Sequence, residues 1–405
     1  MLSAVSKPYI DASVPVLREH GITITTAFYH NLFVEYPELK NLFNMGNQAQ
    51  GTQQQSLAAA VFAYAANISN PEVLTPVISR IVHKHVSLGI LPEHYPIVGR
   101  HLLGAIKEVL GDAATQPLLD AWAEAYGLLA DTLITYEKAL YERLPVAPGY
   151  LTKLKVKNVR QESILVRSFE LASMDGMPLT AFTSGQYVSV AIDLPNGTRQ
   201  LRQYSLSAAP SQPHYRITVK RESHLSENLA DTPAGQVSNW LHDNLKLDDT
   251  LLVGQPSGDF MPEVGLDETI ALISGGVGIT PMVSTLRHLA EVNPLQKVIF
   301  AHAAQSKNHH SHTEDILQAI QLMPNLKVIN FFMDVDNESS DSENEFHGLM
   351  HLKHFPEWDK GNAKFYLCGP ANFMKSIREQ LLENGVEHKH IVKEVFGPGL
   401  LSDLI

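Results

Sequence analysis

Hydrophobic positions follow three different patterns along the chain, and the first of them is helical. From residue 1 to about residue 145, apolar residues recur at intervals of three and four, as on one face of a helix. In the last of these predicted helices the apolar positions are Leu118, Trp122, Tyr126, Ala130, Leu133, Leu140 and Leu144. Prolines suited to helix starts and turns punctuate the segment at residues 37, 71, 76, 92 and 117. We therefore expect an all-helical first part.

The second pattern begins after Pro145-Val146-Ala147-Pro148-Gly149, a run that predicts a linker. Short β-rich runs follow at 153–159, 164–171, 187–192, 202–207, 215–219 and 250–254. Close spacing, with turn residues between the runs, favours an antiparallel barrel.

The third pattern begins at Thr269, where apolar strands alternate with predicted helices. The strands are expected at 269–273, 297–301, 326–332 and 364–368. Such alternation predicts a doubly wound parallel sheet. The polar, acidic stretch 334–345 within it predicts a solvated loop.

Length and composition agree with a multidomain protein of a reducing compartment. A chain of 405 residues is too long for one core. The net charge of −12 gives no general attraction to nucleic acid or an anionic membrane. Cys368 is the only cysteine, the first residues do not form a signal peptide, and no apolar run reaches the roughly 18 residues of a membrane span. We expect a cytoplasmic protein without a membrane span.

Candidate metal chemistry in the helical part centres on His85, which shares a helix face with Ile78, Ile81, Val82 and Leu88. A lone histidine on such a face can equally be a hydrogen-bonded core residue. The segments that would oppose it carry an amide, a phenol and apolar groups, at Gln53, Leu57, Tyr29 and Phe43. Each of these could also be plain core. Together they favour a pocket.

Glu137 interrupts an apolar stripe formed by Leu133, Tyr141 and Leu144, and two interpretations remain open. It can be a partly exposed glutamate solvated beside Lys138 and Arg143. It can instead be buried, in which case its carboxylate needs a donor such as the N–H of a metal-bound imidazole.

The barrel segment contains a run that resembles the flavin signature of the ferredoxin-reductase superfamily, namely Arg202-Gln203-Tyr204-Ser205. The arginine fork suits a phosphate, although an ordinary amphipathic strand has the same alternation. Two further runs support a flavin site: Gly185-Gln186-Tyr187, and Gly235-Gln236-Val237-Ser238 before a helix expected from Asn239. Free N–H groups at that helix start can bind a pyrophosphate, which favours FAD over FMN.

The third part contains the motifs of a nicotinamide site. The turn Gly275-Gly276-Val277-Gly278-Ile279-Thr280-Pro281 follows an apolar strand and opens a helix, as a pyrophosphate-binding turn should. It matches the nicotinamide motif of the same reductases, and Cys368-Gly369-Pro370 completes their pattern. Cys368 can lie near the nicotinamide or be an inert buried thiol. The terminal run Glu394-Val395-Phe396-Gly397-Pro398 resembles the segment in which an aromatic ring covers the flavin.

The order and spacing of these residues resemble the flavohaemoglobins, the bacterial and fungal nitric oxide dioxygenases, along essentially the whole chain. The resemblance implies a globin domain (1–145), an FAD-binding β-barrel domain (146–262) and an NAD(P)-binding domain (263–405). It implies that haem b, FAD and NAD(P)H are the cofactors, and that His85 is the iron ligand. It further implies that Tyr95 and Glu137 form a triad with His85, that Tyr29 and Gln53 hold dioxygen, and that Phe43, Leu57 and Lys84 lie at the haem.

The activity that the resemblance implies is oxidation of nitric oxide by dioxygen to nitrate. We expect a monomer, although the sequence does not determine the oligomeric state. Two alternatives remain: a flavin-dependent NAD(P)H reductase of small acceptors, and a haem protein that senses oxygen or nitric oxide. Two departures concern flavin shielding. Lys393 stands where family members often have an aromatic residue, and the tail 399–405 has no recognisable motif.

Two other clusters invite metal interpretations that we reject. His309-His310-Ser311-His312 lies between a predicted strand and helix among polar neighbours, and we expect it to be a solvated loop. Asp334, Asp336, Glu338 and Glu345 imitate a calcium loop, but Ser339 stands where such a loop needs glycine.

Overall fold

A computed structural model describes residues 2–195, 197–222, 235–263, 268–334, 344–358 and 362–397. The chain folds into two compact units. One is made of the helical segment up to Leu151 with residues 191–202, and the other of residues 152–190 and 203–396. Among the helices that the structure describes, none combines the length and hydrophobicity needed to cross a membrane.

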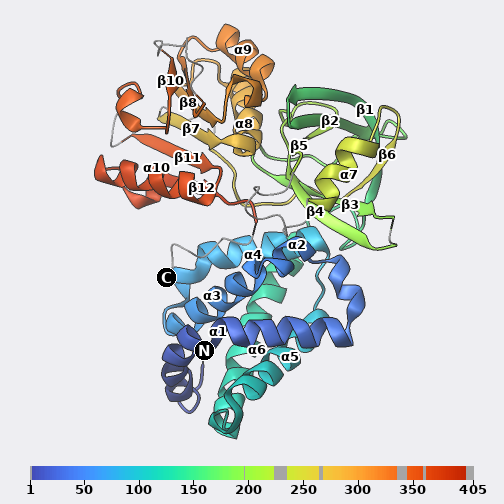
Figure 1. Ribbon diagram of the computed structural model, residues 1–405, viewed down its shortest axis with the longest axis vertical. Coiled ribbons are helices and arrows are strands. Elements are labelled where there is room, and N and C mark those ends of the chain that lie inside the picture. The colour runs from blue at the N-terminus through green and yellow to red at the C-terminus, as the bar shows by residue number, and fades with distance from the viewer. Residues whose placement is uncertain are drawn as a thin grey trace. The chain divides into compact units, whose positions relative to one another are not determined.

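The N-terminal part is all-helical, as predicted (Figure 1). Its α-helices are α1 (Lys7–Glu35), α2 (Met45–Ala49), α3 (Thr52–Ala66), α4 (Thr75–Leu88), α5 (His94–Leu110) and α6 (Gln116–Tyr141). Helices α1, α4 and α6 begin with proline in the first turn, where its missing N–H costs nothing. Helix α4 ends at Gly89, whose φ of 74° favours glycine. A side chain there would also overlap the backbone of Gly149.

Two separate apolar clusters form the core of the helical part. The larger joins α1, α3, α5 and the start of α6, with Phe28, Leu32 and Trp122 among its buried members. The smaller joins α4, α5 and the later part of α6 through Val82, Tyr95, Ala130 and Leu133. Tyr126 packs against both clusters.

The second part contains a six-stranded sheet in the order β4-β3-β6-β1-β2-β5. Its strands are β1 (Thr152–Ser163), β2 (Val166–Ser173), β3 (Tyr187–Asp193), β4 (Arg199–Ser205), β5 (Tyr215–Lys220) and β6 (Thr250–Val253). The antiparallel bridge between Leu206 and Ile217 joins the two ends of this order, so the sheet closes on itself. The predicted antiparallel barrel is confirmed, and α7 (Gln236–Asn244) accompanies it.

The third part is a six-stranded parallel sheet in the order β10-β9-β8-β7-β11-β12. Its strands are β7 (Thr269–Gly275), β8 (Val298–Ala304), β9 (Leu326–Phe332), β10 (Glu345–His347), β11 (Ala363–Cys368) and β12 (Ile391–Glu394). Helices α8 (Ile279–Val292) and α9 (Thr313–Leu322) pack on one face with Ile270 and Leu272. Helix α10 (Ala371–Glu383) packs on the other face with Ala271 and Ile273.

Alternate residues of β7 are thus buried on opposite faces, as in a doubly wound sheet that helices cover on both sides. This confirms the predicted fold class. The hydrophobic pattern did not predict the edge strands β10 and β12, which are short and half-buried. The domain boundaries at 145/146 and 262/263 stay a prediction.

Candidate functional site

Three side chains from three helices, one of them the predicted iron ligand His85, contact one another. His85 on α4 contacts Glu137 on α6, with 2.7 Å between Nδ1 and Oε1. Tyr95 on α5 lies 3.1 Å from the same imidazole nitrogen, and its hydroxyl donates to Glu137 Oε1 at 2.5 Å. Burial, and then the hydrogen bond to Glu137, raise the pKa of Tyr95, so its hydroxyl stays a donor.

The structure separates the two interpretations of Glu137. Glu137 is 2% exposed, whereas Lys138 is exposed and lies 4.0 Å from Glu142. The solvated interpretation is therefore wrong. Because a carboxylate can only accept, Glu137 must receive the hydrogens of Tyr95 and of His85 Nδ1.

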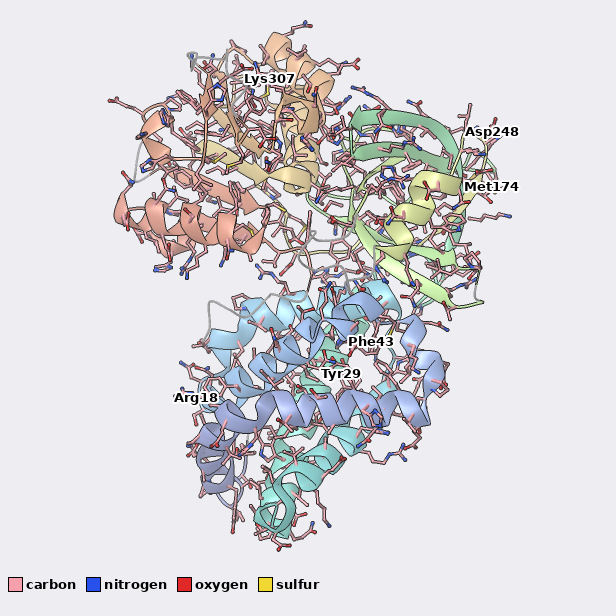
Figure 2. The ribbon with its side chains drawn as sticks, in the orientation of Figure 1. Arg18, Tyr29, Phe43, Met174, Asp248 and Lys307 are labelled. Atoms are coloured by element: carbon pink, nitrogen blue, oxygen red, sulfur yellow. The ribbon has the colours of Figure 1, made fainter. Side chains whose placement is uncertain are left out.

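On the opposite side of the predicted pocket, Tyr29 of α1 receives a hydrogen bond from Gln53 Nε2 of α3 at 3.4 Å. Burial raises the pKa of Tyr29 to about 12, partly offset by Gln53. The phenol is thus protonated at neutral pH and can donate. The ring of Phe43 meets that of Tyr29 edge to face, with centroids 5.6 Å apart. Figure 2 shows both rings inside the helical part.

The arrangement suits a flat, apolar group held by one imidazole. Tyr29, Phe43 and Leu57 belong to the larger apolar cluster, whereas the residues around His85 belong to the smaller one. Phe43, Leu57, Ile81 and His85 are only half-buried despite their apolar surroundings. Within the described residues, the structure shows no partner for His85 Nε2. Lys84, beside His85 on α4, is half-buried.

The predicted flavin residues lie on three elements. Arg202 of β4 donates to the carbonyl of Leu201 at 2.7 Å and to Gln200 Oε1 at 3.2 Å. Gln203 Nε2 donates to Ser189 Oγ of β3 at 3.1 Å, and Ser205 is buried. Tyr187 begins β3 and pairs with Ser257. The motif strands are therefore held in place by their own hydrogen bonds.

Helix α7 begins at Gln236, three residues earlier than expected. Gln236, Val237 and Ser238 are therefore its first turn rather than a loop before it. Backbone N–H groups in a first turn have no partner within the helix, so they can bind a phosphate. Ser238 Oγ instead donates to the carbonyl of Gly235 at 3.1 Å.

The predicted nicotinamide motifs meet at one edge of the parallel sheet. Ser274 at the end of β7 is in register with Cys368 of β11, which is in register with Glu394 of β12. A Cβ at Gly278 would overlap the carbonyl of Cys368, so only glycine permits this approach. These are the carboxyl ends of parallel strands, and between β7 and β11 the strand order reverses, which is where such sheets bind ligands.

Cys368 itself is fully buried, and burial, followed by the charge of Glu394, raises the pKa of its thiol. The thiol is neutral and a poor nucleophile in this protein. Val395 packs against the parallel-sheet core, and Phe396 is 44% exposed. Pro398 and the tail 399–405 lie outside the described residues.

Comparison with known proteins decides the family. The chain is 44% identical to a flavohemoprotein of Rhizobium meliloti (strain 1021) over 411 residues, which cover 100% of both chains. The chain belongs to the flavohaemoprotein family. Within this flavohaemoprotein, a Globin family model matches residues 26–133, and an Oxidoreductase NAD-binding domain model matches residues 272–379.

Solved structures agree with this flavohaemoprotein assignment. The crystal structure of a flavohemoglobin from Malassezia yamatoensis, with bound FAD and heme, has a TM-score of 0.86 at 28% identity. The match covers 98% of this chain and 100% of that one. The FAD/NAD binding domain of a nitric oxide dioxygenase from Vibrio cholerae has a TM-score of 0.53 at 33% identity, over 61% of this chain and 99% of that one.

One rejected cluster of this flavohaemoprotein needs a correction. His310 and His312 are not in a solvated loop: both are buried, His312 completely. Each ring nitrogen of the two residues contacts a polar side chain, among them Asn330 for His310 and Asp315 for His312. Polar neighbours in the sequence suggested solvent, but here they are the partners of buried rings. In the other rejected cluster, Asp336 and Glu338 lie outside the described residues.

Proposed function

We propose that this flavohaemoprotein is an NAD(P)H-dependent nitric oxide dioxygenase, which uses dioxygen to convert nitric oxide to nitrate. As an oxidoreductase with a globin part and a flavin and nicotinamide part, it combines a gas-binding site with a source of electrons. When bound, NAD(P)H supplies hydride, FAD divides it into single electrons, and haem b supplies the iron at which the two gases react. Each nitric oxide converted to nitrate consumes one dioxygen and one electron.

The observation that carries the proposal is the contact between His85 Nδ1 and the buried carboxylate of Glu137 at 2.7 Å. It leaves Nε2 of the same ring to bind the iron, and it would increase the electron density that the imidazole donates to a bound haem. A globin that only carries oxygen gains little from such a strong donor, whereas chemistry on bound oxygen does. Tyr95 holds the carboxylate and the imidazole in place.

On the ligand side, Tyr29 and Gln53 offer hydrogen-bond donors to a gas that accepts negative charge from iron. Phe43 and Leu57 keep the surroundings apolar. Tight retention of dioxygen is poor for delivery but suits a second gas that attacks the first.

The arginine of Arg202-Gln203-Tyr204-Ser205 and the first turn of α7 would bind the FAD phosphates. The glycine turn from Gly275 to Pro281 would bind the pyrophosphate of NAD(P)H at the start of α8. Cys368 and the run from Glu394 to Gly397 would then lie beside the two reacting rings.

The test uses purified full-length protein containing haem and FAD. In aerated buffer with NADH or NADPH, nitric oxide should be consumed catalytically, with one nitrate formed for each nitric oxide. Omission of the nicotinamide should limit conversion to a single turnover. If NAD(P)H reduces added acceptors while nitric oxide is not converted to nitrate, the protein is a reductase and the proposal fails.

A further inference from the structure

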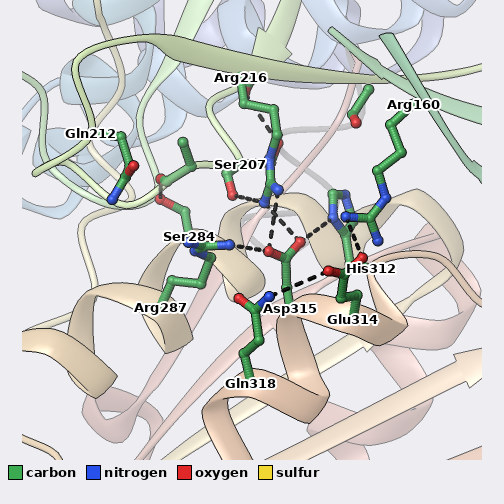
Figure 3. A network of polar contacts seen from close by, with 12 residues as sticks. Arg160, Ser207, Gln212, Arg216, Ser284, Arg287, His312, Glu314, Asp315 and Gln318 are labelled. Carbon is green, nitrogen blue, oxygen red and sulfur yellow. Dashed lines mark hydrogen bonds and ion pairs between the residues drawn. The ribbon is translucent and has the colours of Figure 1, made fainter. Parts of the chain in front are cut away.

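A cluster of buried charges joins the barrel to the parallel sheet inside the second unit. At its centre is Asp315 in the first turn of α9, 2% exposed. Its Oδ2 lies 2.9 Å from Arg216 Nη2 of β5, and its Oδ1 contacts Nη1 of Arg287 on α8. Figure 3 shows the carboxylate between these two guanidinium groups. One carboxylate thus ties three elements together.

On the barrel side, the cluster reaches the segment that directly follows the flavin motif. Arg216 Nη2 donates to the carbonyl of Ser207 at 2.5 Å, and its Nε donates to Ser207 Oγ at 3.1 Å. Ser207 is two residues beyond Ser205, the last residue of that motif. Arg216 therefore holds the end of β4 through Ser207, which is fully buried.

On the sheet side, the cluster reaches the helix that the nicotinamide motif opens. Arg287 lies on α8, and Ser284 of the same helix donates to the carbonyl of Ala208 at 2.7 Å. Ser284 is one helical turn beyond Pro281, the last residue of the motif. Consequently α8 is attached twice to the residues that follow the flavin motif, once directly and once through Asp315.

His312 holds the carboxylate from a third direction. Its Nδ1 lies 2.8 Å from Asp315 Oδ2, and its Nε2 lies 3.0 Å from Thr218 Oγ1 of β5. The residue has a φ of 60°, a left-handed conformation that is rare outside glycine. A residue keeps such a strained conformation only where its contacts with the surrounding structure hold it there. Nδ1 of His312 therefore contacts Asp315, and Nε2 connects the same ring to β5.

Buried ion pairs of this kind contribute little net stability compared with apolar packing. Removing one partner, however, leaves the others as buried charges without compensation, which is strongly destabilising. The arrangement in which every charge is paired is therefore favoured. Burial raises the pKa of Asp315, but the hydrogen bond with His312 and the charge of Arg216 outweigh it and lower that pKa, so the carboxylate is ionised at neutral pH. The cluster is thus better suited to fixing a geometry than to adding stability.

We propose that Asp315 is a positioning residue for hydride transfer: it locks α8 onto the segment after the flavin motif and so sets how the nicotinamide meets the flavin. The inference rests on the proposed FAD and NAD(P)H sites but not on the nitric oxide chemistry. Hydride transfer is sensitive to such a lock, because a displacement of about 1 Å can cost roughly a hundredfold in rate.

The test compares Asp315→Asn, which keeps the volume but removes the charge, with Glu314→Gln on the neighbouring residue. Glu314 also connects the parallel-sheet part to the barrel, through an ion pair with Arg160 at 2.9 Å, but its side chain is 60% exposed. Flavin reduction by NADH is followed anaerobically by stopped flow, with protonated and deuterated NADH. Asp315→Asn should reduce the limiting rate by about a hundredfold, with a larger isotope effect and an unchanged half-saturating NADH concentration. Glu314→Gln should leave all three values unchanged.

Two measurements separate positioning from a general loss of structure. FAD content and the rate of flavin reduction by dithionite, which needs no nicotinamide alignment, should be unchanged in Asp315→Asn. Hydrogen exchange of the nicotinamide-free protein should accelerate in peptides containing Ser207 and Ile316, whose amides donate within the cluster. Should Asp315→Asn fail to fold, Ser284→Ala decides, with a smaller slowing of the same step.

An unchanged limiting rate, or equal slowing with dithionite, would overturn the inference. Its failure is distinct from failure of the proposed function. A protein whose flavin is reduced by NADH but which makes no nitrate contradicts only the nitric oxide activity. A protein whose flavin is reduced by neither NADH nor NADPH contradicts both.

Discussion

Among the described residues, two histidine–carboxylate pairs have a buried carboxylate and nearly the same geometry. His85 Nδ1 lies 2.7 Å from Glu137 in the helical part, and His312 Nδ1 lies 2.8 Å from Asp315 in the second unit. They differ at the other ring nitrogen. His312 Nε2 contacts Thr218 and its side chain is fully buried, whereas His85 has a side chain 30% exposed and, in the described residues, no partner at Nε2.

The carboxylates differ as well. Asp315 is neutralised by two arginines, whereas Glu137 receives hydrogens only from a phenol and the imidazole among the residues that the structure describes. Glu137 is therefore suited to polarising its histidine, whereas Asp315 is suited to holding together β5 and α8, the elements that carry its two arginines. A histidine–carboxylate pair thus indicates a ligand site only where the second ring nitrogen has no protein partner and the carboxylate is not already neutralised by basic side chains.

The largest expected difference is in haem content. His85→Ala should abolish stable haem binding while FAD remains bound, because this histidine would be the only protein ligand to the iron. His312→Ala removes the matching ring from the other pair and should leave haem content unchanged. Haem and flavin are quantified by absorbance after purification. Full haem content in His85→Ala, with an unchanged ferrous spectrum, would show that His85 is not the iron ligand and that the two pairs do not differ in this respect.

Tyr29→Phe examines the open side of the His85 pocket. It removes a donor to a charged acceptor, worth about 1.5–3 kcal/mol, so dioxygen should dissociate about ten- to a hundredfold faster. Tyr64→Phe is the matched control, because the Tyr64 hydroxyl already donates to the Ala125 carbonyl. Laser photolysis or ligand replacement measures the off-rate. Equal off-rates in wild type and Tyr29→Phe would show that the phenol does not contact the ligand.

Glu137→Gln should have the smallest effect, since it deletes no ligand. A neutral amide accepts more weakly, so the imidazole donates less to iron. Haem should remain bound, the iron–histidine stretching frequency should fall and the haem potential should rise. Nitric oxide turnover should fall by about tenfold, while flavin reduction by NADH is unaffected.

The exposed Glu142 on the same face as Lys138 supplies the control for that experiment. Glu142→Gln should leave the resonance Raman spectrum of the ferrous protein unchanged. An iron–histidine band unshifted in Glu137→Gln as well would mean that the carboxylate does not act on the iron ligand.

Much of the fold was predictable because its signals are local. Helical periodicity, the change after residue 145, and the strand runs from 153 to 254 correspond to observed elements. Strands β10 and β12 were missed because short edge strands have too few apolar residues to show a pattern. The start of α7 was placed late, at Asn239, for the same lack of an apolar first turn.

The candidate site was predictable to different degrees. Motifs in one run, such as the glycine turn from Gly275, can be recognised in the sequence because their function needs adjacent residues. The choice between a solvated and a buried Glu137 could not be made, since it depends on α4 and α5 packing against α6. The expectation for the histidines at 309–312 was wrong for a related reason: whether a polar segment meets water or other polar groups is decided by residues distant in the sequence.

The sequence by itself therefore determined the succession of helical, antiparallel and parallel parts, and it named the candidate residues for the chemistry. Periodicity and turn residues act over a few positions, where the backbone has few choices. Only the tertiary structure decided the partners: Glu137 with His85, Asp315 with Arg216 and Arg287, and Ser274, Cys368 and Glu394 in one register. Burial and charge pairing depend on which surfaces meet, and that is a property of the whole packed unit rather than of any segment.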